Sequence, residues 1–444
     1  MSSAPVIEPK ARLRRELGLW ALVFYGIVMI QPAAPMPLFG VVSQVALGHM
    51  VTTLAIAMCA MMLTALSYGR MARVYPSAGS VYTYVSREIH AGAGFVAGWS
   101  TMLSYLFNPI ISVIWCSKAA VNVSPVIPFS VWVVFFALLF TMMNLLGIRT
   151  SARTTQALVL GMVAVIVTFL VSAARYVLHL PGVDAAYLTR PIYDTSTFSF
   201  HAVATGTSIA VLTFIGFDSV STLSEEAHNP RRNVLLATVL TCLVVGILSI
   251  IEIYAGQLVW PDYKNFPDVD TAFSFVAGRA GGIAMFHMVN FMLLVAQLGS
   301  GMAVQLSAVR LLYGMGRDGA IPKSFFGAIE PRRGIPRNNV LFTGALVLIG
   351  AFSVNYQLGA ELLNFGAFIG FMGVNAAAFV RGRRNWREWL PAALGFLICF
   401  GIWASLRPPV LIMGCLWMLA GAAYGAYRTN GFRRKVEFVE APLD

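Results

Sequence analysis

The stretch TFIGFDSVSTLSEEAHNPRR, from Thr213 to Arg232, closes an apolar run that begins near His201. Asp218 stands inside that run, two residues after Gly216, and the run ends in two glutamates, an Asn-Pro pair and two arginines. A carboxylate is costly in an apolar environment unless it is paired or neutralised. A fold proposed for this chain must therefore explain a carboxylate inside an apolar run.

The rest of the chain is strongly apolar. Of its 444 residues, 58% are hydrophobic and 11% are charged, and the mean hydropathy is +0.74, whereas a soluble domain carries about 25% charged residues. Apolar runs of about 20 residues cross a bilayer as α-helices, which satisfy their own backbone hydrogen bonds. The composition therefore predicts an all-α integral membrane protein.

Twelve apolar runs are candidates for membrane-spanning helices, and no soluble domain fits between them. The connections, marked by Pro, Gly, Asn and Arg, are longest at 179–200, 259–281 and 313–338. We expect residues 1–444 to form a single transmembrane domain. The expected spans are roughly 18–42, 50–72, 92–118, 128–147, 155–178, 201–224, 234–258, 282–312, 339–356, 360–380, 390–406 and 410–427.

The basic residues indicate the orientation. With the N-terminus inside, 25 of the 31 Lys and Arg residues fall on inner segments and six on outer ones. Because cytoplasmic loops are rich in Lys and Arg, both termini are expected in the cytoplasm. The net charge of +12 is then mostly a signal of topology, so the expected surroundings are a lipid bilayer and not a nucleic acid.

Other classes of protein lack support in the sequence. The five cysteines are scattered and the six histidines do not pair at metal-ligand spacing, so we expect neither a metal site nor a disulfide framework. Motifs of the G-x-S-x-G, H-E-x-x-H and Walker types are missing, which argues against an enzyme or a resident cofactor. A channel would need a filter or a ring of charges, and neither is visible.

Two spans carry interruptions in matching places. The first reads GIVMIQPAAPMPLFG, Gly26 to Gly40, with prolines at 32, 35 and 37; proline removes a donor and clashes with the preceding turn. The sixth carries Gly216 and Asp218. A charge at a helix centre costs about 2.5–3.5 kcal/mol on insertion scales and usually faces a cavity.

Interruptions in spans 1 and 6 begin the two halves of a five-plus-five arrangement. Paired interrupted helices indicate the binding site of a secondary transporter. We expect a first inverted repeat at 18–178, a second at 201–380 and peripheral helices at 390–427. The alternatives are simple proline kinks and a six-plus-six transporter, which would not need matched breaks.

Several stretches resemble the amino acid–polyamine–organocation (APC) permeases over about residues 10–430, nearest to bacterial putrescine importers. GFDSVSTLSEEAHNPRR is similar to their sixth-helix signature. Others resemble the loop after helix 2 (SYGRMARVYPSAGSVYTYV, Ser67–Val85), helix 3 (GWSTMLSYLF, Gly98–Phe107), the end of helix 8 (SAVRLLYGMGRDGAIP, Ser307–Pro322) and helix 10 (NFGAFIGFMGVN, Asn364–Asn375). The resemblance implies twelve helices, alternating access in a bacterial inner membrane, and uptake of a small amine or amino acid, usually coupled to protons.

The resemblance also assigns a role to Asp218. It aligns with an acidic position that relatives transporting polyamines, arginine or agmatine use for substrate or proton binding. A carboxylate suits a cationic amine because charge-assisted hydrogen bonds are strong. It also suits proton coupling, because burial and a bound cation shift its proton affinity in opposite directions. Phe214, one turn earlier, is either a gate or cation–π wall or plain helix packing.

The first span departs from the pattern of amino acid permeases, which have a Gly-rich break whose N–H groups hold the substrate carboxylate. Here the break reads Gln31-Pro32-Ala33-Ala34-Pro35, and proline supplies no N–H. That favours a polyamine such as putrescine. However, the importers carry further acids in helices 1 and 3, where this chain has Pro37 and Ser104. An amino acid permease or exchanger, and a permease-like sensor, therefore stay open.

Other polar residues are candidates for the transport path or for helix packing: Gln31, Ser104, Tyr105, Gln297 and Ser300. Glu361, at the start of span 10, either supplies a second acid or is a solvated residue, and Glu252 in span 7 is a weaker candidate. Lys118 is expected to extend its charge to the membrane interface.

A gate is expected at the inner end of span 6. Its candidate residues are Glu225, Glu226, Arg231 and Arg232, with Arg70, Arg73 or the 313–338 connection as partners. Salt bridges made in one state and broken in another would close the path. The alternative is a solvated helix end, where exposed ion pairs contribute only about 0–1 kcal/mol.

Overall fold

The computed structural model describes residues 17–75, 80–146, 152–222, 227–317, 321–330 and 335–428. Within these ranges every regular element is a helix, and β pairing is limited to two isolated bridges. The expectation of an all-α membrane protein is confirmed.

Nine helices in the described ranges are long and apolar enough to cross a membrane. Each satisfies its own backbone hydrogen bonds, as a lipid environment demands. They are α3 (Met50–Val74), α5 (Ala91–Val123), α6 (Phe129–Leu146), α7 (Ala152–Leu178), α11 (Pro230–Val259), α12 (Ala272–Arg317), α15 (Tyr356–Gly382), α16 (Trp386–Ala404) and α17 (Pro408–Arg428).

The expected connections contain short helices. These are α4 (Ser80–Glu88), α8 (Ala185–Thr189) and α13 (Lys323–Phe326). A further apolar helix, α14 (Arg337–Ser353), has 17 residues and is one residue shorter than the shortest of the nine long helices. The connection expected at 259–281 contains the first part of α12, which begins at Ala272. Gly282, with a φ of 77°, is not helical and divides α12 into two parts at the residue where the sequence predicted the span to start.

The chain leaves the helical conformation at both of the places singled out in the sequence. α1 (Leu19–Ile30) ends before Gln31, which has a φ of 72°, and helix resumes at η1 (Met36–Leu38) and α2 (Phe39–Val45). Later, α9 (Phe200–Ala210) and η2 (Val211–Phe214) are followed by four non-helical residues before α10 (Ser219–Thr222).

The two non-helical stretches lie against each other. Gly216 has a φ of 123°, a conformation that glycine tolerates and residues with a Cβ rarely adopt. A Cβ built on Gly216 would lie 3.2 Å from the carbonyl oxygen of Met29, at the end of α1. Glycine is therefore needed here both for the backbone conformation and for the close approach of the first segment.

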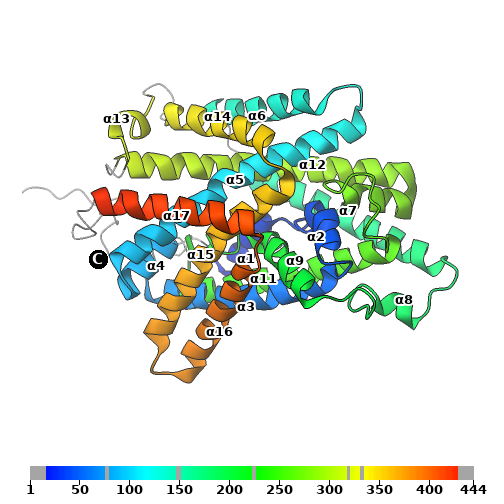
Figure 1. Cartoon of the computed structure of the whole chain (residues 1–444), viewed down its shortest axis with the longest axis horizontal. Helices are drawn as coiled ribbons and strands as arrows, with labels where there is room; N and C mark the ends of the chain where they lie inside the picture. Colours follow the sequence, from blue (N-terminus) through cyan, green and yellow to red (C-terminus); the bar gives the residue numbers. More distant parts are fainter. Residues whose placement is uncertain are drawn as a thin grey trace, which may run out of the picture.

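The long helices surround these two segments (Figure 1). α3 packs along α11, and α5 packs between α12 and α15. In Figure 1, α6 and α14 lie side by side along one edge of the molecule, and α16 lies at the opposite edge. The interior of the bundle is thus formed by α1, α3, α5, α11, α12 and α15, which places any site there away from lipid.

Candidate functional site

A cavity of about 110 Å³ lies beside the two non-helical stretches. Met29 from the end of α1 and Ile215, Gly216 and Asp218 from the second stretch form one wall. The other walls come from α3, α5, α12 and α15. The volume suits a small metabolite, since sites for drug-sized ligands are about 300–1,000 Å³.

Among the residues with described positions, Asp218 is the only acidic one that lines this cavity, and no Lys, Arg or His of that set lines it. Its backbone carbonyl accepts hydrogen bonds from the N–H of Ser221 at 2.9 Å and from the Ser221 hydroxyl at 2.6 Å. These bonds fix the position at which α10 begins. The phenol groups of Tyr68 and Tyr105 line the same cavity as this carboxylate.

Neutral polar groups line the wall opposite the second stretch. α5 contributes Thr101, Ser104, Tyr105 and Asn108. The Ser104 hydroxyl donates a hydrogen bond of 2.6 Å to the carbonyl oxygen of Leu363, which ties α5 to α15. The Asn108 Oδ1 is buried and has no hydrogen-bond partner in the described part of the chain. It is therefore an acceptor open to a ligand.

Aromatic rings close one side of the cavity. Tyr68 and Phe371 both line it, and their ring centroids are 6.1 Å apart in an edge-on arrangement. Phe217 lies 5.6 Å from Tyr68 and 5.4 Å from Phe371. The three rings form a cluster next to Asp218, and aromatic faces attract a cation brought close to them.

The structure brings together four of the seven predicted substrate-binding residues: Ser104, Tyr105, Gly216 and Asp218 line the cavity. Ser300, the other candidate on α12, lines it too. The sequence analysis did not single out Tyr68, Asn108 or Phe371. Tyr68 and Phe371 lie within stretches that carry the family resemblance, which is the signal that could have found them.

The remaining three predicted residues lie outside the lining. The fully buried ring of Phe214 packs towards Gly246 of α11. The Gln31 Nε2 donates a hydrogen bond of 2.9 Å to the carbonyl oxygen of Ala296, which fastens the first non-helical stretch to α12. The Gln297 Oε1 accepts one of 3.3 Å from the Ser112 hydroxyl. Each side chain thus has a packing contact in this conformation.

Glu361 is neither beside the cavity nor solvated. Its side chain is fully buried, and the Arg407 Nε donates to both of its carboxylate oxygens at 2.8 Å. The Gln357 Nε2 adds a third hydrogen bond of 3.1 Å. The pair joins α15 to the start of α17, so Glu361 holds a peripheral helix in place.

Lys118 has specific partners near the C-terminal end of α5. Its Nζ lies 3.6 Å from a carboxylate oxygen of Asp268 and 4.0 Å from one of Asp270. The pKa of Asp270 is raised to about 6, mainly by burial and also by neighbouring Asp268, while Lys118 acts to lower it. The cluster ties α5 to the connection before α12.

The predicted gate falls partly outside the described residues, which exclude Glu225 and Glu226. Arg231 and Arg232 are exposed on the first turn of α11. The Arg70 guanidinium donates hydrogen bonds of 2.7 and 2.9 Å to the backbone carbonyls of Glu388 and Arg387, at the start of α16. Arg70 therefore anchors a peripheral helix in this conformation.

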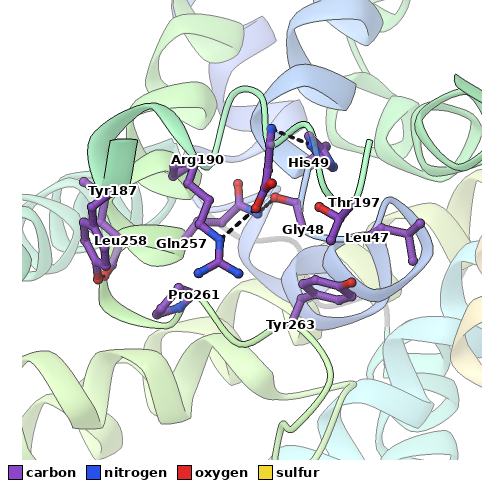
Figure 2. A pocket seen from close by; sticks show the side chains of 12 residues that line it. Leu47, Gly48, His49, Tyr187, Arg190, Thr197, Gln257, Leu258, Pro261 and Tyr263 are labelled. Carbon is purple, nitrogen blue, oxygen red and sulfur yellow. Dashed lines mark hydrogen bonds and ion pairs between the residues drawn. The ribbon is translucent and has the colours of Figure 1, made fainter. Parts of the chain in front are cut away.

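A second cavity, of only about 20 Å³, lies among the α2–α3, α7–α9 and α11–α12 connections (Figure 2). The His49 Nε2 accepts a hydrogen bond of 3.1 Å from the backbone N–H of Asp194, whose carboxylate pairs with Arg190 at 3.1 Å. The Gln257 Nε2 donates to the carbonyl oxygen of Gly48 at 2.6 Å. These bonds fasten the α7–α9 connection over the turn between α2 and α3, and the space left is of the order of a water molecule.

Comparison with known proteins identifies the relatives of this chain. The model of the amino acid permease family matches residues 36–437. The low-affinity putrescine importer PlaP of Escherichia coli strain K12 is 33% identical over 443 residues, which cover 96% of each chain. The branched-chain amino acid permease BcaP of Bacillus subtilis is 24% identical with 92% of each chain covered. The vacuolar cationic amino acid transporter 4 of Arabidopsis thaliana is 25% identical over 83% of this chain and 63% of its own.

Proposed function

This chain belongs to the amino acid permease family, a group of membrane transporters and not enzymes, and from that premise we propose that it imports a small cationic amine, a polyamine such as putrescine, across the bacterial inner membrane. Import proceeds by alternating access and is coupled to protons. The observation that carries the proposal is the cavity, where Asp218 is the one charged residue among the described residues of the lining.

The lining favours a cation over an anion or a zwitterion. The described lining offers a carboxylate and no basic side chain, and a bound ammonium group gains a charge-assisted hydrogen bond to Asp218. Asn108 supplies an acceptor for a second ammonium group. An amide holds a charge less strongly than a carboxylate does, so affinity for a diamine is expected to be modest.

An amino acid would need donors for its α-carboxylate. Met29, at the end of α1, lines the cavity, whereas residues 31–35 of the first non-helical stretch are not among its described lining residues. The two prolines of that stretch, at 32 and 35, have no N–H to offer. The relatives include a branched-chain amino acid permease and a cationic amino acid transporter. An amino acid permease or exchanger is therefore the second candidate, and a permease-like sensor the third.

The packing of the helices supports the twelve-span, five-plus-five arrangement. Counting α1–α2 as the first span, α9–α10 as the sixth and α14 as the ninth gives twelve. Spans that occupy the same place in the two halves then pack together: α3 with α11, α5 with α12, and α6 with α14. A pseudo-two-fold axis between inverted repeats produces such pairs.

Proton coupling is assigned to Asp218, because one carboxylate that can hold either a proton or an ammonium group links the two ligands. The orientation follows from the basic residues, with both termini in the cytoplasm. The outer end of the bundle is then the end drawn in Figure 2. No metal or resident cofactor is needed for this function.

The deciding experiment is uptake of labelled putrescine by proteoliposomes with an inward proton gradient. We expect accumulation that ends when the gradient is collapsed, and competition by unlabelled diamines but not by amino acids. Accumulation of a labelled amino acid without putrescine uptake would establish the second candidate. Rates that ignore the proton gradient but need sodium would overturn proton coupling.

A further inference from the structure

Glu252 is an acidic residue in the middle of the bundle whose role the proposed function does not explain. It lies on α11, and its side chain is fully buried. Neither of its carboxylate oxygens has a hydrogen-bond partner in the described part of the chain. The hydroxyl of Ser249, one turn away on the same helix, is likewise buried without a partner there.

The contrast with Glu361 shows what a structural acid looks like in this fold. Glu361 is equally buried but has Arg407 and Gln357 on its two oxygens. Buried charges are ordinarily paired in this way, because an unpaired ion loses its hydration without compensation. Glu252 lacks such partners, and burial is the one influence that acts on its charge.

Helix geometry shows which way Glu252 faces. It follows Thr241 by 11 residues, about three whole turns, and precedes Gly256 by about one turn, so the three lie on one side of α11. The Thr241 hydroxyl donates a hydrogen bond of 3.4 Å to the carbonyl oxygen of Val23 in α1. A Cβ built on Gly256 would lie 3.0 Å from the ring of Phe39 in α2.

Glu252 therefore faces the first interrupted segment, at a level between α1 and α2. Along the axis of α11, Glu252 lies about 6 Å from Gly256, the residue that faces Phe39, because a helix rises 1.5 Å per residue. That level corresponds to the non-helical stretch between Ile30 and Met36. Prolines at 32 and 35 remove N–H donors from that stretch, which leaves the backbone there poor in groups that could stabilise a carboxylate.

The groups around α11 do not supply a counter-charge either. The elements packed on it are α1, α3, α7, α10, α12 and η2. Their titratable side chains with described positions lie elsewhere, at Tyr25, Cys59, Tyr68, Arg70, Arg73, Asp218 at the start of α10, Arg175, Tyr176, Arg279, His287 and Tyr313. None of them forms a hydrogen bond with the Glu252 carboxylate.

We propose that Glu252 is a proton-binding residue of the transport cycle. In the conformation described, a proton taken from water forms the O–H bond of its carboxylic acid. When the first interrupted segment moves away from α11, water reaches the group, the O–H bond breaks, and the proton leaves on the other side. This inference rests on the proposed proton-coupled transport. It makes Glu252 a second proton-binding carboxyl group in addition to Asp218.

The test separates substrate movement from proton movement in proteoliposomes. Exchange of labelled for unlabelled putrescine at equal pH needs no net proton flux, whereas accumulation under an inward proton gradient does. We expect Glu252→Gln, which is permanently neutral, to lose at least tenfold in accumulation and to lose substrate-dependent proton entry into dye-loaded vesicles. Its exchange rate should stay within about threefold of the parent protein.

Glu361→Gln is the matched control. It changes another buried glutamate of the bundle and should lower thermal stability while leaving the ratio of accumulation to exchange unchanged. Glu252→Asp keeps a carboxyl group and should retain proton entry with a shifted pH profile, which keeps the proposal testable if the Gln variant fails to insert.

The outcomes are distinguishable from failure of the proposed function. If the parent protein accumulates putrescine and Glu252→Gln does so equally, with the same proton entry, Glu252 is not a proton-binding residue. Equal losses in exchange and accumulation would show a merely structural role. A parent protein that exchanges putrescine but ignores the proton gradient would overturn proton coupling and this inference together.

Discussion

The two interrupted segments are built by opposite means. The first loses its helix through prolines that remove hydrogen-bond donors, and it ends α1 at Gln31 with a φ of 72°. The second loses its helix at Gly216, whose φ of 123° lets the chain turn beside Met29. Only the second presents a charged side chain, Asp218, to the cavity. The first segment therefore contributes shape, and the second contributes the chemistry.

The largest effect is expected when the charge is removed from the second segment. Asp218→Asn keeps the size of the side chain but removes the partner of the ammonium group. We expect uptake of labelled putrescine to fall at least a hundredfold, with unchanged insertion and monodispersity in detergent. Near-normal uptake by this variant would sink the role assigned to Asp218.

The next largest effect is expected at the backbone of the same segment. Gly216→Ala places a Cβ 3.2 Å from the Met29 carbonyl oxygen, in a backbone conformation that costs of the order of 1–2 kcal/mol for a residue with a side chain. Uptake should fall about tenfold and the melting temperature should drop. Gly161→Ala is the matched control, because no atom lies within 4 Å of its added Cβ. Equal behaviour of the two variants would contradict the need for glycine at 216.

A smaller effect is expected from the first segment. Gln31→Ala removes the hydrogen bond to the Ala296 carbonyl, and such bonds contribute about 0.5–1.5 kcal/mol. Uptake should fall two- to fivefold with no change in the order in which diamines and amino acids compete. A changed order of competitors would show that the first segment contacts substrate and does more than set the shape.

The smallest effect is expected outside both segments, at Asp270. Its pKa of about 6 lies above the usual value near 3.8, so the folded state holds this proton more tightly than the unfolded one. The contribution of that proton to stability is complete below pH 4 and is lost as pH rises through about 6. Two pKa units correspond to roughly 3 kcal/mol.

Asp270→Asn removes this dependence. The melting temperature of the variant should match the parent near pH 4 and exceed it by a few degrees near pH 7.5. Transport at a fixed pH should change less than twofold, because Asp270 does not line the cavity. A parent protein that becomes more stable as pH rises from 5 to 7, relative to the variant, would contradict the sign.

Most of the helical plan could be read from the sequence, because a lipid environment permits only long apolar helices and each has a local signature. The start of the span predicted at 282 coincides with Gly282, where a non-helical residue divides α12. The sequence analysis did not predict the shorter helical part that precedes it from Ala272, because a Gly-rich stretch of moderate hydropathy resembles a connection.

Side chains with distant partners could not be placed in this way. Glu361 was read as a second acid of the site or as a solvated residue, yet it pairs with Arg407. Phe214 lies one turn before Asp218, yet η2 turns its ring towards Gly246. A helical wheel assumes regular geometry, and it fails next to an interruption.

The apolar helices and the two interruptions could be read from the sequence, and so could Asp218 as a candidate for the site, because hydropathy, proline, glycine and a carboxylate in an apolar run are local signals. The tertiary structure alone decided which polar residues share the cavity with Asp218, that Glu361 has a cationic partner, and that Glu252 has none in the described part of the chain. Those outcomes depend on which helices pack together, and the contacts that settle them join residues far apart in the chain.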